Sequence, residues 1–202
     1  NHGLPLAAWR AVGHSFTAFA KETLMDELAE MAGLNGFEFR RRNLQNNPRL
    51  LGALEAVEQG LEQWDIPAGH HIGISTHGSF RSFVAQAAEV SIEGNKIRVH
   101  RVLCAIDCGA VINPDIVRAQ IEGGIMFGLT AALYGNIEIE NGAVKQSNFH
   151  DYKMLRMNEA PAVDVLIVES EQAPSGVGEP GLPPIAPAVA NAVYQATGQR
   201  LY

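Results

Sequence analysis

The sequence predicts an α+β fold, in which helices precede a mixed, largely antiparallel sheet. Three observations lead to this prediction. Apolar residues recur at helical spacing through the first third of the chain. β-Forming residues then fill several consecutive stretches, and short turn signals join two of these stretches closely enough to pair them antiparallel. With 202 residues, 47% of them hydrophobic, the chain can bury a core of its own.

Three helices are predicted in the first third of the chain. Ser15 is a candidate N-cap for the first helix, and Gly33 ends it. The second helix is expected over 36–45, where the three arginines 40–42 are predicted to form a solvated helix end. The third is expected over 49–64. The apolar residues that mark the first and third helices are Phe16, Phe19, Leu24, Leu28, Met31, Leu50, Leu54, Val57, Leu61 and Trp64.

Three strands are predicted after residue 69. Ile72 and Ile74 alternate with other residues in the first strand, and the second covers 83–92. Glu93-Gly94-Asn95 is a tight-turn signal that leads into a third strand over 96–107. The second and third strands are therefore expected to form an antiparallel pair.

A long helix is predicted from the start signal Asn113-Pro114-Asp115 to about Tyr134. Gly123 and Gly124 interrupt it at a cost of about 1 kcal/mol each. Such glycines indicate the close approach of a ligand or of another backbone, and packing against a neighbouring helix explains them equally well.

The last third of the chain carries two more strand signals and one helix. Asn141-Gly142 predicts a hairpin between 136–140 and 143–147. A further strand is expected over 164–169. The apolar spacing that begins at Ile185 predicts a final helix, which Gly198 stops.

Composition excludes several classes of protein. The net charge is −7 without a basic stripe, so nucleic acid is not an expected partner. No uninterrupted apolar run reaches the roughly 18–20 residues that span a bilayer. Cys104 and Cys108 are too few for a four-thiolate iron–sulfur cluster and are expected in the core. The seven histidines show no metal-ligand spacing: His2, His14, His70, His71, His77, His100 and His150.

In the stretch 175–184, three glycines and three prolines surround one charge, that of Glu179. Glycines let the backbone approach a ligand closely, and prolines stiffen the loop. Glu179 is therefore a candidate general base, and the competing interpretation is that it balances the dipole of the following helix. The segment 176–181 also matches the dinucleotide pattern G-x-G-x-x-G. That match is weak, because Pro180 lies inside it and the preceding strand ends too early.

Four segments gain significance when they are taken in order: Trp9-Arg10-Ala11-Val12-Gly13-His14, Gln120-Ile121-Glu122-Gly123-Gly124-Ile125-Met126-Phe127-Gly128, Ser147-Asn148-Phe149-His150-Asp151-Tyr152 and Gly176-Val177-Gly178-Glu179-Pro180-Gly181. Together they resemble the C-terminal part of the large subunit of the molybdenum hydroxylases. The resemblance covers essentially the whole chain. It is closest to the isoquinoline 1-oxidoreductase β subunit and bacterial aldehyde dehydrogenases, with xanthine dehydrogenase and aldehyde oxidase more distant.

The resemblance implies a fold of the molybdenum-cofactor-binding type and a molybdenum–pterin cytosine dinucleotide, in which the pterin dithiolene holds the metal. No protein side chain is expected to ligate the metal. Glu179 is implied as the catalytic base that takes a proton from a metal-bound hydroxide, which then hydroxylates an aldehyde or an aromatic N-heterocycle. The residues implied at the cofactor are Arg10, Ala11, Val12, Gly13, Gln120, Gly123, Gly124 and Gly178.

One departure from the family pattern bears on the substrate. Ala11 and Val12 stand where xanthine-type members carry a glycine and a substrate-stacking phenylalanine. Without that aromatic ring, a purine is not the expected substrate. A smaller aldehyde or a different N-heterocycle is expected instead.

Two portions are expected, a helical segment 1–66 that carries the metal-site loop of residues 10–13, and an α+β portion 67–202 that binds the molybdopterin dinucleotide and carries the Glu179 loop. The resemblance implies three partners, which are a small-molecule substrate, a separate iron–sulfur subunit and the upstream half of the same subunit. The first residue is Asn1 rather than Met, so a fragment or a processed piece is expected. The relatives occur on either side of the bacterial inner membrane, so the compartment stays open. The alternatives are a catalytically silent binding or assembly module and, more weakly, a nicotinamide-dependent oxidoreductase.

Overall fold

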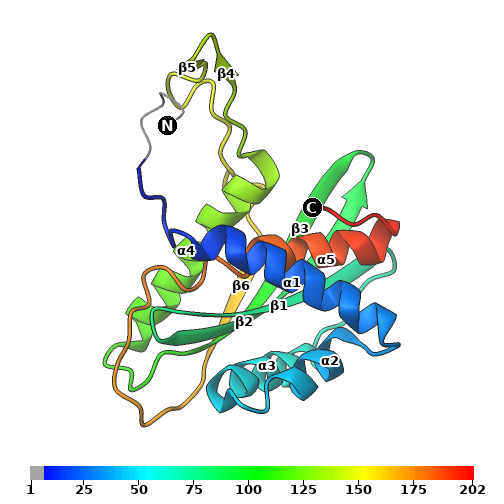
Figure 1. Ribbon diagram of the computed structural model, residues 1–202, viewed down its shortest axis with the longest axis vertical. Coiled ribbons are helices and arrows are strands. Elements are labelled where there is room, and N and C mark those ends of the chain that lie inside the picture. Colours follow the sequence, from blue (N-terminus) through cyan, green and yellow to red (C-terminus); the bar gives the residue numbers. More distant parts are fainter. Residues whose placement is uncertain (1–6) are drawn as a thin grey trace.

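The computed structural model describes residues 7–202, and its centre is a four-stranded sheet in the order β1-β2-β3-β6 (Figure 1). Strands β1 (His70–Ser79), β2 (Ser82–Glu93) and β3 (Lys96–Asp107) form an antiparallel meander. Strand β6 (Ala162–Ile167) pairs with β3 in parallel and begins two residues earlier than expected. The prediction of an α+β fold with a mixed, largely antiparallel sheet is confirmed. His2 lies outside the described residues.

The helices of the described part lie where periodicity and end signals predict them: α1 (His14–Met31), α2 (Gly36–Asn43), α3 (Pro48–Leu61), α4 (Pro114–Tyr134) and α5 (Ile185–Thr197). Asn35, Asn47 and Asn113 cap α2, α3 and α4, because each side chain accepts hydrogen bonds from backbone N–H groups of the first turn. The expected cap of α1 is wrong. Gly13 occupies the N-cap position, and the Ser15 hydroxyl donates to the Val12 carbonyl instead.

Each face of the sheet carries its own core, because successive side chains of a strand point to opposite faces. On one face Val84 and Ala88 of β2 pack against α4 and α5. On the other face Ala85 and Ala87 pack against α3. Figure 1 accordingly shows α3 on one side of the strands and α5 on the other. Cys104 and Cys108 are buried in the first core, as expected.

Helix α1 covers the edge strand β1 with its polar side. The Glu22 carboxylate is 1% exposed, and it accepts hydrogen bonds from Thr76 N at 2.9 Å and from Arg40 Nε at 2.8 Å. Arg40 is itself 0% exposed, so the prediction of a solvated helix end is wrong for this residue. Its charge can be buried because Glu22 and backbone carbonyls pair with it. Glu22 and Arg40 thereby satisfy the Thr76 N–H and the Ile74 carbonyl, two backbone groups at the open edge of β1.

The apolar side of α1 is left facing outward. Of the five apolar side chains that marked this helix in the sequence, Phe19 is half-buried and the other four are exposed: Phe16 at 69%, Leu24 at 53%, Leu28 at 38% and Met31 at 78%. Periodicity therefore located the helix correctly, but the buried side is the one that carries Glu22, Thr23 and Asp26.

Two features follow β3. By length and by its mean hydropathy of 1.2, α4 alone among the described helices could cross a membrane, yet Ile121, Ile125 and Leu129 are fully buried in the core. The predicted hairpin is present but short, with β4 (Ile139–Glu140) and β5 (Ala143–Val144) joined at Asn141-Gly142. Figure 1 shows that it projects away from the body beyond the end of α4.

Candidate functional site

Three of the segments singled out in the sequence meet in the structure. Arg10 Nε donates a hydrogen bond to the Gly178 carbonyl oxygen at 2.8 Å, and Arg10 Nη2 donates to the same oxygen and to Gln120 Oε1 at 3.2 Å. The backbone N–H of Ala11 donates to Glu179 Oε1 at 2.9 Å. These partners lie 110 and 168 residues away in the sequence. One arginine and one backbone amide thus join the loop of residues 10–13 to α4 and to the glycine–proline loop.

The loop of residues 10–13 has an unusual backbone. Ala11 has φ 68° and Val12 has φ 42°, values that side chains disfavour, most of all a β-branched one. Hydrogen bonds from Val12 N to the Trp9 carbonyl and from His14 N to the Ala11 carbonyl, both 2.9 Å long, hold the turn. The result is that the Ala11 side chain is buried while its N–H group points to Glu179. Strain of this kind persists only where the surroundings enforce it, and it concentrates at functional sites.

Glu179 is half-buried and keeps its carboxylate free of a cationic partner in these contacts. Arg10 bonds the Gly178 carbonyl and Gln120 rather than the carboxylate. The carboxylate does not serve the dipole of α5 either, since that helix begins at Ile185 behind an N-cap at Pro184, while Glu179 Oε1 bonds Ala11. This arrangement leaves a carboxylate that can accept a proton.

Three polar side chains beneath the glycine–proline loop hold it in place. Ser75 Oγ donates to the Pro184 carbonyl at 2.5 Å, Ser82 Oγ to that of Gly176 at 2.8 Å, and Gln86 Nε2 to that of Gly181 at 2.8 Å. All three side chains are 0% exposed. No sequence motif had pointed to these residues, and the signal that could have found them is a polar residue inside an otherwise apolar strand.

The two glycines of α4 have different surroundings. A Cβ at Gly124 would lie 3.4 Å from the backbone of Gly181 and Leu182, so the close approach of the loop accounts for this glycine. Gly123 is exposed, and a Cβ there would meet no atom within 4 Å. A Cβ at Gly178, in the loop, would also meet no atom within 4 Å. Gly123 and Gly178 therefore present bare backbone to open space.

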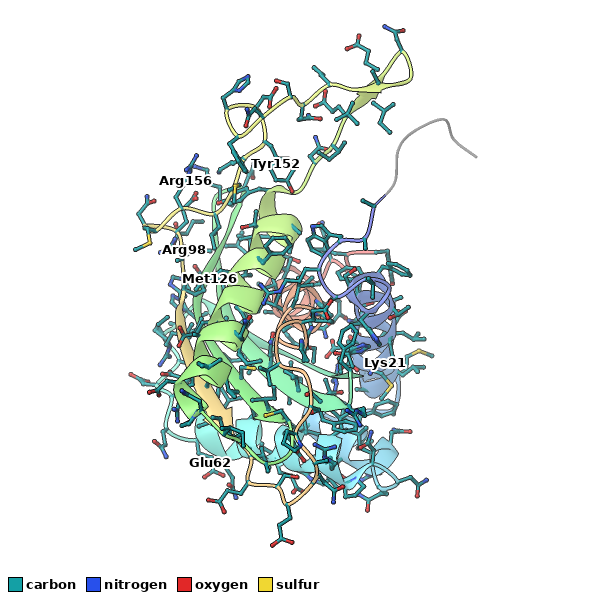
Figure 2. All side chains as sticks on the ribbon, turned by 90° about the vertical axis from the view of Figure 1, so that its left-hand side faces the viewer. Lys21, Glu62, Arg98, Met126, Tyr152 and Arg156 are labelled. Atoms are coloured by element: carbon teal, nitrogen blue, oxygen red, sulfur yellow. The ribbon has the colours of Figure 1, made fainter. Side chains whose placement is uncertain are left out.

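A cavity of about 630 Å³ adjoins Gly123. Figure 2 labels three of its lining residues, Met126 on α4 and Tyr152 and Arg156 on the segment beside that helix. The segment 147–152 contributes to the cavity and also forms a turn, because Phe149 and Tyr152 line the cavity while the Asp151 carboxylate accepts hydrogen bonds that close a turn. Backbone N–H groups of Asn148 and Ser147 lower the Asp151 pKa to about 2.

Neither this cavity nor a second, apolar one of about 490 Å³ between α1, α4 and α5 includes Glu179. The candidate base lies instead beside the contacts of Arg10. Because the candidate base lies where the three segments meet and outside both cavities, this meeting point is the better candidate for the reactive centre.

The loop does not build a nicotinamide site. In the dinucleotide-binding fold the glycines directly follow a strand and open the next helix. Here β6 ends at Ile167, well before Gly176, and α5 begins only after Gly181.

The residues at the convergence fit a pterin cofactor. Gly123 and Gly178 leave room at the backbone, and exposed Gln120 uses its Oε1 for Arg10 so that its Nε2 can donate to a ligand. Within residues 7–202, no three His, Cys, Asp or Glu side chains converge on a metal position.

Comparison with known proteins supports this fit. The model of the molybdopterin cofactor-binding domain matches residues 20–161. The β subunit of isoquinoline 1-oxidoreductase from Brevundimonas diminuta is 38% identical over 95% of this chain and 25% of its own length. The membrane-bound aldehyde dehydrogenase (pyrroloquinoline-quinone) from Gluconacetobacter polyoxogenes is 29% identical over 95% of this chain and 28% of its own length. The chain thus spans about a quarter of these relatives.

A solved structure extends the likeness to the fold. Quinoline 2-oxidoreductase from Pseudomonas putida 86 matches 96% of this chain and 50% of its own, with a TM-score of 0.83 and 15% identity. The resemblance to the large subunits of molybdenum hydroxylases is confirmed. Because the family model covers most of the chain, the chain belongs to the molybdopterin cofactor-binding domain family.

Proposed function

We propose that the chain is the C-terminal part of the catalytic subunit of a molybdenum hydroxylase, which oxidises an aldehyde or an aromatic N-heterocycle with oxygen from water. The observation that carries this proposal is the convergence of Arg10, Gln120 and the Gly178 carbonyl, together with the hydrogen bond from Ala11 N–H to the Glu179 side chain. Three segments that the family resemblance implied at one centre are in direct contact.

Glu179 acts in this proposal as the general base. The Ala11 N–H group holds Oε1 at 2.9 Å and so orients the carboxylate. The rigid loop beneath it limits the directions in which the carboxylate can move, since Ser75, Ser82 and Gln86 anchor three of its carbonyls. A base held in one orientation gains rate because its proton transfer needs little rearrangement. When bound, the molybdenum–pterin cofactor supplies the metal that activates water and accepts the two electrons of the substrate.

The cofactor would be held by the amide of Gln120 and by the bare backbone of Gly123 and Gly178, with Gly124 keeping α4 close to the loop. Residues 10–13 would also help to hold the cofactor. We propose the pterin cytosine dinucleotide form, an iron–sulfur subunit that removes the electrons, and an upstream half of the same subunit that completes the pocket. In this arrangement the segment 1–66 contributes the metal-site loop, and 67–202 contributes the dinucleotide and base portion.

The substrate proposal rests on the Val12 position and on the relatives. Val12 is 45% exposed beside the site and offers no aromatic face, so a purine is not favoured. The names of the two relatives refer to isoquinoline and to an aldehyde. Parallel assays with an N-heterocycle and with an aldehyde series would divide these two classes.

The test is Glu179→Gln in the full-length protein, with Glu171→Gln as the matched control. The first change keeps size and hydrogen bonding but removes the base, while Glu171 is exposed in the segment before the loop. We expect Glu179→Gln to abolish turnover while the molybdenum content and the released cytidine monophosphate stay unchanged. Glu171→Gln should keep normal turnover and normal cofactor content. Near-normal turnover of Glu179→Gln would refute the assignment. Folded wild-type protein from a molybdenum-replete host that contains neither molybdenum nor cytidine monophosphate would refute the cofactor.

A catalytically silent binding or assembly module is the second candidate. The observation that favours it is the outward apolar side of α1, which has Met31 at 78% exposure. Cofactor analysis of the 202-residue chain alone separates the candidates for this piece. Folded chain that binds no cofactor would assign it an assembly role, without contradicting the activity of the full-length protein.

A further inference from the structure

We propose that His14 and His77 form a positioning pair that fixes the loop of residues 10–13 and, through Ala11, the carboxylate of Glu179. The inference rests on the proposed role of Glu179 as base. It adds two residues to the machinery that neither contact the carboxylate nor ligate a metal.

The pair bridges two distant elements. His14 Nδ1 and His77 Nε2 are 2.9 Å apart, and the two residues are 63 positions apart in the sequence. His14 is the first residue of α1, whereas His77 belongs to β1 and is 8% exposed. Phe80 packs edge-on against the His14 ring, with centroids 5.0 Å apart at 64°. The His14 ring is therefore held by a hydrogen bond and by an aromatic contact.

His14 also closes the strained turn. Its backbone N–H donates to the Ala11 carbonyl at 2.9 Å, while the N–H of the same Ala11 donates to Glu179. Both Ala11 and Val12 have positive φ, so the turn needs restraints on each side to keep this conformation. Arg10 restrains the turn before Ala11 through Gly178. The histidine pair restrains it after Val12 by tying His14 to the sheet.

The surroundings keep His77 neutral at physiological pH. Burial, followed by the positive charge of Lys21 and by His14, lowers the pKa of His77 to about 4, and Glu22 opposes this shift. Lys21 and Glu22 both belong to α1, and Figure 2 labels Lys21 there. A neutral imidazole can share one proton with its partner across an N–H···N bond. In the described part of the chain, His77 Nδ1 is buried and has no hydrogen-bond partner. Among the described residues, the bond to His14 is thus the hydrogen bond that the His77 side chain makes.

The test compares His77→Leu, which removes the bond, with His77→Gln, whose amide can replace the ring Nε2. His100→Leu is the matched control, because His100 makes a similar bond to Ser91 Oγ at 2.8 Å but lies on β3 away from the turn. Hydrogen exchange of residues 11–14 would be measured in full-length protein freed of cofactor. The same variants would then be assayed with cofactor for kcat, KM and molybdenum content.

We expect His77→Leu to speed exchange of residues 11–14 by about tenfold, because local opening becomes easier. We expect kcat to fall about 10- to 100-fold, since a small displacement of a catalytic group has that effect, with KM within about twofold and molybdenum unchanged. His77→Gln should restore both readouts, and His100→Leu should change neither.

Unchanged exchange in His77→Leu, or an equal change in His100→Leu, would overturn the proposal. Should His77→Leu fail to fold, His14→Phe keeps the packing against Phe80 while removing Nδ1, and it must show the same faster exchange. The exchange measurement needs no turnover. Suppose that His77→Leu shows the expected faster exchange of residues 11–14 while Glu179→Gln keeps its turnover. The role of the histidine pair would then stand, and the proposed function would be refuted.

Discussion

Gly73→Ala should separate α5 from the sheet. Gly73 lies on β1 under α5, and a Cβ there would be 2.0 Å from the Ala188 carbonyl oxygen and 2.2 Å from Ala192 N. A carbon and an oxygen normally stay at least about 3.3 Å apart. Because both obstacles are backbone atoms, no side-chain rotation can relieve the clash, and the helix must retreat by about 1 Å or more.

The cost of this movement can be bounded. Overpacking a well-packed core costs about 1–3 kcal/mol, and backbone clashes place Gly73→Ala at the upper end, near 3 kcal/mol. For a unit of this size the melting temperature should fall by about 6–12 °C. The displacement should also reach the site, because Pro184, just before α5, accepts the hydrogen bond from Ser75 and belongs to the loop that carries Glu179.

Gly52→Ala on α3 is the control, since its Cβ would meet no atom within 4 Å. Removing the flexibility of a helical glycine should stabilise by about 0.5–1 kcal/mol. The assay is thermal unfolding of the full-length protein, with hydrogen exchange to locate the change in α5. A melting temperature for Gly73→Ala within about 2 °C of wild type would refute the claim that α5 is held at this distance.

Four further outcomes follow from the structure. Arg40→Met removes the buried cationic partner of Glu22, leaves it paired only with the partly exposed Lys21, and should cost about 3–5 kcal/mol by denaturant titration. Arg41→Met, in a partly exposed pair with Glu38, should cost below about 1 kcal/mol. Burial alone would raise the pKa of Glu22, but the charges of Arg40 and Lys21 hold it below 4.5. The ionised carboxylate therefore contributes its full stabilisation above about pH 4.5, and this stabilisation is lost as the pH falls through the lower pKa of the folded state. Glu22→Gln should flatten that loss when the free energy of unfolding is measured against pH. Gly123→Ala should stabilise cofactor-free protein by about 1 kcal/mol yet lower its molybdenum content after reconstitution, because the added Cβ enters the open space beside α4. Arg10→Lys cannot bond Gly178 and Gln120 as a fork does, and the loss of about two hydrogen bonds should weaken cofactor retention on gel filtration by about tenfold or more.

The sequence located the helices and strands because their signals are local. An asparagine at a helix start or at the Asn141-Gly142 turn acts on backbone groups only a few residues away, so a short stretch of sequence is enough to predict the helix start or the turn. Apolar periodicity locates a helix, but it does not tell which side is buried when the polar side can also pack against the protein through paired charges. On α1 the apolar side is exposed, because the buried Glu22–Arg40 pair needs the polar side against β1.

Some features of the site follow from local sequence, and others depend on contacts between distant segments. Glu179, Gln120 and the residues 10–13 could be named from ordered motifs, since each motif is a short run of the chain. Their mutual contacts, and the support from Ser75, Gln86 and His77, join residues up to 168 positions apart and leave no local pattern. By itself the sequence determined the elements and the motif residues, since short-range chemistry encodes both. Only the tertiary structure decided which of those residues meet and what holds them, because long-range contacts exist only after the sheet and α5 have packed.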